Sequence, residues 1–261
     1  MTYFEFLAFF LLPPLVLTAT LAVRALRQQE PGTPLRRFGP LTLALLIPTA
    51  WVWTVPWDSW IIRHGVWSYG QGRFLAALFH VPYEEFVFMA AQAAVAGLWT
   101  TWNLARTPEP PPREPHRTWR VSFAVAWAAA AAAGLGLVLV DRHGTYLGAT
   151  LLWFAPPLAL QSAVGADLLM SRRRTRVWTL IPLLAYLCVT DRIAIGAGVW
   201  HISPASTYGI EIQGLPFEEI VFFLITSVLV TNALMLTTDP AVHARLRARY
   251  PKRPARQAIR A

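Results

Sequence analysis

Seven long runs of apolar residues constrain this chain more than any other feature of its sequence. The runs cover approximately Tyr3–Val23, Phe38–Val55, Tyr83–Asn103, Trp119–Val140, Tyr146–Met170, Val177–Val189 and Phe217–Thr237. Charged residues make up 14% of the chain, against about 25% in an average soluble domain, and they crowd between the runs. A helix of about 20 apolar residues crosses a bilayer. The sequence therefore predicts an all-α polytopic membrane protein with seven transmembrane helices. The short sixth one continues through Ile195 if Asp191 and Arg192 lie at the membrane interface.

The basic residues predict how these helices are oriented. If the loops alternate across the membrane, all but four of the 23 Lys and Arg residues fall on one side. The four exceptions are Arg63, Arg73, Arg142 and Arg192. Because basic loops stay in the cytoplasm, we expect the N-terminus outside and the C-terminus in the cytoplasm, in the cell membrane. The net charge of +9 then meets lipid headgroups, and no nucleic-acid partner is expected.

The chain also contains an internal duplication. Asp58 precedes Trp67 by nine residues, and Asp191 precedes Trp200 by nine. Further matches pair Val81–Phe88 with Leu215–Phe222, Tyr3 with Tyr146, and Pro13-Pro14 with Pro156-Pro157. We predict a first repeat over residues 1–105, a loop and linking helix over 106–143, a second repeat over 144–238 and a basic cytoplasmic tail over 239–261. Since the linking helix resets the direction of the chain, the two three-helix repeats are expected to be parallel.

Each repeat carries a Pro-x-Glu-Glu motif at the start of its last apolar run. The two motifs are Pro82-Tyr83-Glu84-Glu85 and Pro216-Phe217-Glu218-Glu219. Proline suits the first position of a helix, and the helix dipole stabilises acidic residues in the first turn, so one such motif is explained by helix formation alone. Two of them, at matching positions and leading into apolar spans, favour a functional role. Spacing leaves open which glutamate of each pair faces inward.

Such carboxyl groups are suited to acid–base chemistry on a hydrocarbon. A carboxyl group kept from water holds its proton and can act as an acid, while a second, ionised one acts as a base. Aromatic residues that follow the motifs, Phe88, Phe222 and Phe223, can stabilise a cation. Protonation of an olefin, followed by deprotonation of the carbocation, needs these groups and a cavity without water.

Two further residue pairs allow two interpretations each. Asp58 and Asp191 are predicted near the outer ends of spans, with Arg63 and Arg192 close in sequence, so they form either structural ion pairs or a proton relay. Trp67 and Trp200 are either anchors at the membrane interface or groups that stabilise a cation. The histidines show no metal-ligand spacing, and no metal site is predicted.

Together these motifs resemble the membrane lycopene cyclase family, in the fused two-domain form of archaea and fungi. The resemblance depends on Asp-(x)8-Trp followed by Leu-Pro-Phe-Glu-Glu with Phe222 and Phe223, and it extends from Tyr3 to about Leu236. It implies a β-cyclase, an isomerase of the intramolecular lyase type, that closes the linear ends of lycopene to β-ionone rings in carotenoid biosynthesis. No cofactor is expected, because no Gly-x-Gly-x-x-Gly motif is present.

The resemblance implies these site residues. The candidate catalytic residues are Glu84, Glu85, Glu218, Glu219, Asp58 and Asp191. The candidate substrate-binding residues are Trp67, Trp200, Phe88, Phe222, Phe223, Pro82 and Pro216. Lycopene or a related linear carotenoid is the expected substrate, and other enzymes of carotenoid biosynthesis are possible partners. The family also includes cyclases of C50 carotenoids, so the substrate length and ring type stay open.

Three alternative functions make different demands on the sequence. A retinal protein needs a lysine in its last span, and the only lysine, Lys252, lies beyond it. A proton-coupled transporter would share the duplicated halves and the intramembrane carboxylates, with mid-span breaks such as Pro48, Pro156 and Pro157. A non-catalytic assembly partner of another enzyme is the third alternative.

Overall fold

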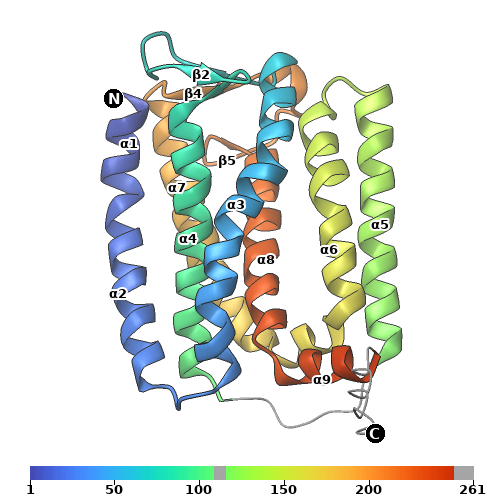
Figure 1. Cartoon of the computed structure of the whole chain (residues 1–261). Coiled ribbons are helices and arrows are strands. Elements are labelled where there is room, and N and C mark those ends of the chain that lie inside the picture. The colour runs from blue at the N-terminus through green and yellow to red at the C-terminus, as the bar shows by residue number, and fades with distance from the viewer. Residues whose placement is uncertain (109–115, 250–261) are drawn as a thin grey trace, which may run out of the picture.

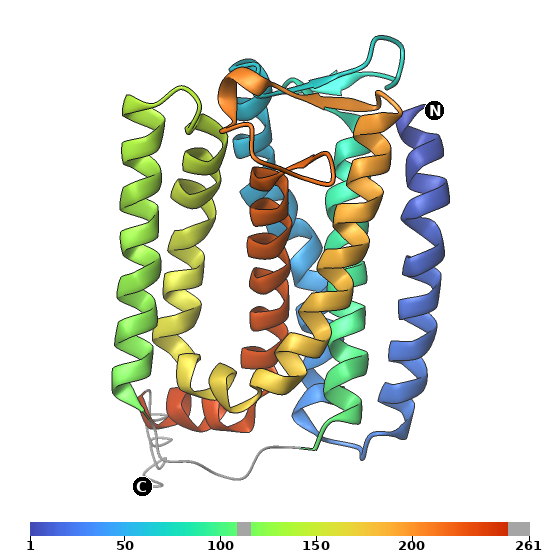
Figure 2. The same ribbon diagram turned by 180° about the vertical axis from the view of Figure 1, so that it is seen from behind.

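A computed structural model describes residues 1–108 and 116–249 as a bundle of long helices. The helices are α1 (Tyr3–Phe10), α2 (Leu12–Gln28), α3 (Pro34–Arg63), α4 (Tyr83–Arg106), α5 (Arg117–Val140), α6 (Thr145–Ser171), α7 (Arg173–Gly196), α8 (Phe217–Thr237) and α9 (Pro240–Arg249). Figures 1 and 2 show α2 to α8 running side by side, with the N-terminus at one end and α9 at the other. Arg113 and most of the predicted tail, including Lys252, lie outside the described residues.

Within residues 1–108 and 116–249, six helical segments are long and apolar enough to cross a membrane. They are α1 with α2, α3, α5, α6, α7 and α8. The all-α membrane fold is thus confirmed. The remaining predicted span corresponds to α4, whose 24 residues measure about 36 Å but include Glu84, Glu85 and several other polar residues. Because α4 packs against α2, α3, α7 and α8, it presents less surface to lipid than a peripheral helix does.

Prolines shape several of the helices. The first predicted span is divided at Leu11, ahead of Pro13 and Pro14, because neither proline has an N–H to continue the hydrogen-bond ladder. The sixth predicted span does continue past Asp191 and Arg192, since α7 ends at Gly196, one residue beyond the predicted Ile195.

At the end of the bundle that holds the N-terminus (Figure 1), the described residues form three short strand pairs, which the sequence did not predict. β1 (Trp67–Tyr69) pairs antiparallel with β4 (Trp200–Ile202), and this pairing joins the two halves. β2 (Ala77–Leu78) pairs with β3 (Val81–Pro82), and β5 (Glu211–Ile212) pairs with β6 (Leu215–Pro216). Both hairpins have two central residues with positive φ, as type I′ turns require. Each hairpin leads directly into α4 or α8.

At the opposite end, the chain continues after α8 into one more helix of the described residues. The predicted tail begins with α9, which lies across the end of the bundle (Figure 1). Arg245 of α9 forms an ion pair with Asp167 of α6, and one Nη donates to Oδ1 at 3.0 Å. His243 stacks on Phe38. The first part of the tail is therefore packed against the bundle.

Candidate active site

The two Pro-x-Glu-Glu motifs form the first turns of α4 and α8. Pro82 and Pro216 are the N-cap residues, with φ of −55° in both. Each therefore lies one residue before the first helical position, where the sequence placed it. Each proline also ends a hairpin strand, and neither lines the two cavities described below. Their positions account for the start of each helix.

The first glutamate of each motif bonds the backbone of the segment that precedes the hairpin. Glu84 accepts a hydrogen bond from the backbone N–H of Leu75 at 2.9 Å, and Glu218 accepts one from the N–H of Tyr208 at 2.8 Å. Both side chains are 1% exposed, and neither lines the cavities. Of the six predicted catalytic carboxyl groups, these two bond the backbone that precedes the hairpins.

The second glutamate of each motif faces the interior and meets tyrosine hydroxyls. Glu85 Oε2 accepts hydrogen bonds from Tyr3 at 2.6 Å and from Tyr69 at 2.9 Å. Glu219 Oε1 accepts one from Tyr146 at 2.8 Å. Removal from water, together with the nearby Glu85, raises the pKa of Tyr69 well above its ordinary value, so this phenol remains a donor.

The two aspartates are buried but differ in their partners. Asp191 accepts a hydrogen bond from the indole Nε1 of Trp200 at 2.9 Å. Both carboxyl oxygens of Asp58, which is 1% exposed, lack a hydrogen-bond partner among the described residues. The ion pairs found in residues 1–108 and 116–249 are Arg172–Asp239 and Arg245–Asp167. The ion-pair interpretation of Asp58 and Asp191 is therefore wrong, and the relay interpretation stays a prediction.

A small cavity brings the carboxyl groups of the two halves together. Its volume is about 20 Å³, and it is lined by Tyr3, Trp67, Tyr69, Glu85, Phe88, Asp191, Trp200, Glu219, Phe222 and Phe223. Glu85 comes from the first repeat, and Asp191 and Glu219 come from the second. The volume is enough for a single water molecule.

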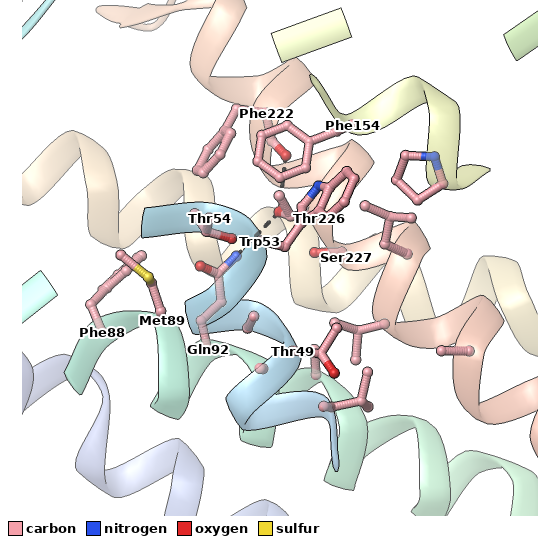
Figure 3. Close-up of a pocket in the computed structure, with 18 of the residues that line it drawn as sticks. Thr49, Trp53, Thr54, Phe88, Met89, Gln92, Phe154, Phe222, Thr226 and Ser227 are labelled. Carbon is pink, nitrogen blue, oxygen red and sulfur yellow. Dashed lines mark hydrogen bonds between the residues drawn. The ribbon is translucent and has the colours of Figure 1, made fainter. Parts of the chain in front are cut away.

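A larger cavity of about 250 Å³ lies beside it, between α3, α4, α6 and α8. Figure 3 shows its wall, in which Phe88, Phe154 and Phe222 are combined with Gln92 and Thr226. The Gln92 amide donates to the Thr226 hydroxyl at 3.4 Å. Asp58 and Glu85 also line this cavity. Glu85 is thus the carboxyl group that borders both cavities.

Aromatic rings form the wall between the cavities. Trp57 stacks on Phe222, with ring centroids 5.1 Å apart and an interplanar angle of 5°. Trp67 meets Phe222 edge-on at 5.5 Å, and Trp200 packs against Tyr3 at 5.1 Å. Trp67 and Trp200 are only 9% and 8% exposed. They do not lie at the lipid surface, so their interpretation as interface anchors is wrong.

Comparison with known proteins identifies the family. The family model described as lycopene cyclase matches residues 2–102 and 143–236. The chain belongs to the lycopene cyclase family. It is 37% identical to a lycopene beta-cyclase of Halobacterium salinarum over 237 residues, which are 90% of this chain and 95% of that protein. No solved structure matches it.

Fungal relatives of this lycopene cyclase family member contain a further enzyme. A bifunctional lycopene cyclase/phytoene synthase of Leptosphaeria maculans is 33% identical over 201 residues, which are 72% of this chain and 34% of that protein. A similar bifunctional protein of Sporisorium reilianum is 32% identical over 204 residues, 73% of this chain and 29% of that protein. This chain therefore spans about a third of their length.

The structure of this chain also shows site residues that the sequence did not predict. They are the glutamate-binding tyrosines Tyr3, Tyr69 and Tyr146, and the aromatic residues Trp53, Trp57 and Phe154. The signal for two of them was available, because Tyr3 and Tyr146 match in the duplication. Tyr69 and Trp57 lack such a signal, since only the folded chain places them beside Glu85 and Phe222. Phe223 lines the small cavity but not the large one.

Proposed function

We propose that this chain is a lycopene β-cyclase that closes the linear end groups of lycopene. The observation that carries the proposal is the pair Asp58 and Glu85 at one end of an apolar cavity between α3, α4, α6 and α8. The substrate is a hydrocarbon, which dissolves in the bilayer and makes no hydrogen bonds. A cavity lined mainly by apolar side chains, with two carboxyl groups, provides both a binding surface and the groups needed for proton exchange.

Asp58 is assigned as the acid. A buried carboxyl group with no hydrogen-bond partner is far less costly when neutral than when ionised, because its charge would have no compensation. The neutral form carries the proton that the reaction needs. Transfer of this proton to the terminal double bond of the substrate leaves a tertiary carbocation, and the neighbouring double bond attacks it to close the six-membered ring.

Glu85 is assigned as the base. Two phenol hydroxyl groups donate to its Oε2, and such hydrogen bonds stabilise the ionised form of a carboxyl group. The carboxylate removes a proton from the ring carbon next to the cation, which forms the new double bond. One proton is added and one is lost, so substrate and product are isomers and no oxidant or reductant is consumed. We therefore propose that no redox cofactor is needed.

Three phenylalanine rings of the large cavity are assigned to the stabilisation of the carbocation. The rings of Phe88, Phe154 and Phe222 line the cavity, as do Asp58 and Glu85. A cation near an aromatic face is stabilised by roughly 2 kcal/mol or more when water is absent. These rings supply no nucleophile, so they stabilise the cation without capturing it.

The proposal includes an arrangement in the membrane. Seven spans, made of α1–α2, α3 and α4 in one repeat, α6, α7 and α8 in the other, and the linking helix α5, would place both repeats in the same direction. With the N-terminus outside, the carboxyl groups lie toward the outer leaflet. In support, the N-terminus and all three strand pairs lie at one end of the bundle, whereas α9, with its arginines, lies at the other (Figure 1).

The test is expression of the chain in a host that accumulates lycopene. We expect the extracted pigments to shift from linear to cyclic carotenoids, with β rings identified by chromatography against standards. The same host with an empty vector is the control. An unchanged pigment profile, in cells where the protein is demonstrably inserted in the membrane, would contradict the proposal.

A further inference from the structure

The large cavity is present on one side of a bundle whose two halves otherwise correspond. Positions of α3 and α7 correspond at an offset of 133 residues, as Asp58 and Asp191 do. Positions of α4 and α8 correspond at an offset of 134, as Glu85 and Glu219 do. Positions of α1–α2 and α6 correspond at an offset of 143 residues, as Tyr3 and Tyr146 do. The cavity between α3, α4, α6 and α8 therefore has an equivalent location between α7, α8, α2 and α4.

Small side chains keep the cavity open in the first location. Ala50 and Thr54 of α3 and Ala233 of α8 line it. At the equivalent positions the residues are Leu183, Leu187 and Trp99. Each of the three is larger than its counterpart in the first location, so the same backbone arrangement leaves less space in the second location.

The larger side chains fill the second location. Leu183 is 5% exposed and Leu187 is 2% exposed, and both belong to the main hydrophobic core. The Trp99 indole extends from α4 to α7, where Nε1 donates to the backbone oxygen of Thr179 at 3.1 Å. Well-packed interiors leave no space for an additional hydrocarbon group.

The carboxyl groups of the two halves differ in the same way. Asp58 and Glu85 line the cavity of about 250 Å³. Asp191 and Glu219 line the one of about 20 Å³, which is too small for any part of a polyene. Asp191 also keeps a hydrogen bond from Trp200, whereas Asp58 has no partner among the described residues.

The large cavity opens sideways, toward the lipid. Thr49 and Trp53 of α3, both labelled in Figure 3, line the cavity and are exposed, with Trp53 at 40%. Pro157 and Gln161 of α6 form the opposite side. Its volume is below the roughly 300–1,000 Å³ of sites for drug-sized ligands, so it holds one end of a long polyene while the rest extends into the bilayer.

We propose that this protein has a single cyclisation cavity, which one substrate end reaches from the lipid between α3 and α6. Asp58 and Glu85 contact that end, and Asp191 and Glu219 act as positioning residues behind the aromatic wall. A substrate with two linear ends is then cyclised in two separate binding events. The singly cyclised carotenoid is released between them. This inference rests on the proposed function for its chemistry.

The first test exchanges residues between the two locations. Ala50→Leu with Thr54→Leu fills the cavity, and we expect cyclisation to fall by about 100-fold because the end group loses its reactive position. The matched control, Leu183→Ala with Leu187→Thr, opens the second location and is expected to change the rate by less than about threefold. Equal losses in the two double variants, or full activity in the filled one, would overturn the proposal.

The time course provides a second readout. If the singly cyclised product is released, it accumulates first, and the doubly cyclised product follows after a lag. Addition of excess unlabelled lycopene during turnover of labelled lycopene traps the label in the singly cyclised form. Doubly cyclised product formed from the start, without a lag and without effect of the added lycopene, would show that both ends react in one binding event.

A thiol-labelling experiment detects the cavity independently of activity and of the stability of the filled variant. In a chain carrying Cys188→Ala, a cysteine is introduced at Thr54 or, as the matched control, at Leu187. A lipid-soluble alkyl methanethiosulfonate is expected to label the cysteine at 54 and to leave the one at 187 unlabelled, and lycopene should slow the labelling. Equal labelling at both positions would refute a one-sided cavity. If the labelling is one-sided but the unaltered chain forms no rings, the proposed function fails while the cavity stands.

Discussion

Tyr3 donates a 2.6 Å hydrogen bond to Glu85, which lies 82 residues further along the chain. The phenol is 1% exposed and the glutamate is 5% exposed, so water does not compete for this bond. The bond joins the first turn of α1 to the first turn of α4. It positions the carboxylate that we assign as the base, and it reduces the basicity that the carboxylate would otherwise have.

Substitution of Tyr3 by Phe removes this donor and leaves the ring in place. We expect a 10- to 100-fold lower kcat, since hydrogen bonds to charged groups contribute about 1.5–3 kcal/mol. Tyr69 is the second donor to the same oxygen, and we expect Tyr69→Phe to lower kcat by a similar factor. The measurement is the initial rate with membranes and dispersed lycopene. Tyr186→Phe, which removes a phenol that bonds the Phe10 backbone oxygen, is the control and should retain its rate.

The two glutamates of the first motif should respond differently to amide substitution. Glu85→Gln removes the proposed base, and we expect conversion to fall by at least about 100-fold, in the range of general acid–base contributions. Glu84→Gln keeps an oxygen that can accept from the Leu75 N–H, so most of the activity should remain. Pigment analysis at matched protein levels measures both. Normal cyclisation by Glu85→Gln would refute the assignment of the base.

The two aspartates provide a similar comparison. Asp58→Asn removes the proposed proton donor, and we expect a 100- to 10,000-fold lower kcat with little change in KM. Asp191→Asn keeps an acceptor for the Trp200 indole, so a smaller loss is expected. If Asp191→Asn were the more damaging change in kcat, the second half would contain the acid and our assignment would be reversed.

The hairpin before α8 should depend on a glycine. Gly214 has φ of +77°, and a Cβ there would lie 2.7 Å from Arg192 Nε. Gly214→Ala is expected to destabilise the protein by about 1–2 kcal/mol through the left-handed backbone, with an added contribution from the contact. Gly209→Ala, at φ of +69° with nothing within 4 Å of the new Cβ, is the matched control. Thermal unfolding in detergent measures both, and equal shifts would show that the contact with Arg192 does not matter.

The helix positions were predictable because each depends on local composition. In lipid, a single apolar run can pair its backbone N–H and C=O groups within itself only as a helix. The start of α8 at Phe217 follows directly from the preceding proline. The exact ends were less predictable. α7 continues through Asp191 and Arg192 because the carboxyl group turns inward to Trp200 while the Arg192 guanidinium reaches the Gln213 backbone oxygen.

The candidate carboxyl groups were predictable from the duplication, but which of them line a cavity was not. Residues 84 and 85 are adjacent on a helix, and spacing alone cannot say which one meets a cavity. That choice depends on partners far away in sequence, such as Tyr3, and on the backbone N–H of Leu75, which precedes the hairpin. The interpretation of Trp67 and Trp200 as interface anchors failed for the same reason, since β1 and β4 pair and hold both indoles inside.

The sequence by itself determined that this protein is a membrane-embedded bundle with acidic pairs at two matching helix starts. These features follow from local composition and from residue spacing along a single helix. Only the tertiary structure decided which glutamate faces inward and which of two equivalent locations is open. The reason is physical: a cavity is defined by the side chains of several helices at once, and Ala50 opens space only because Ala233, far away in sequence, lines the same cavity.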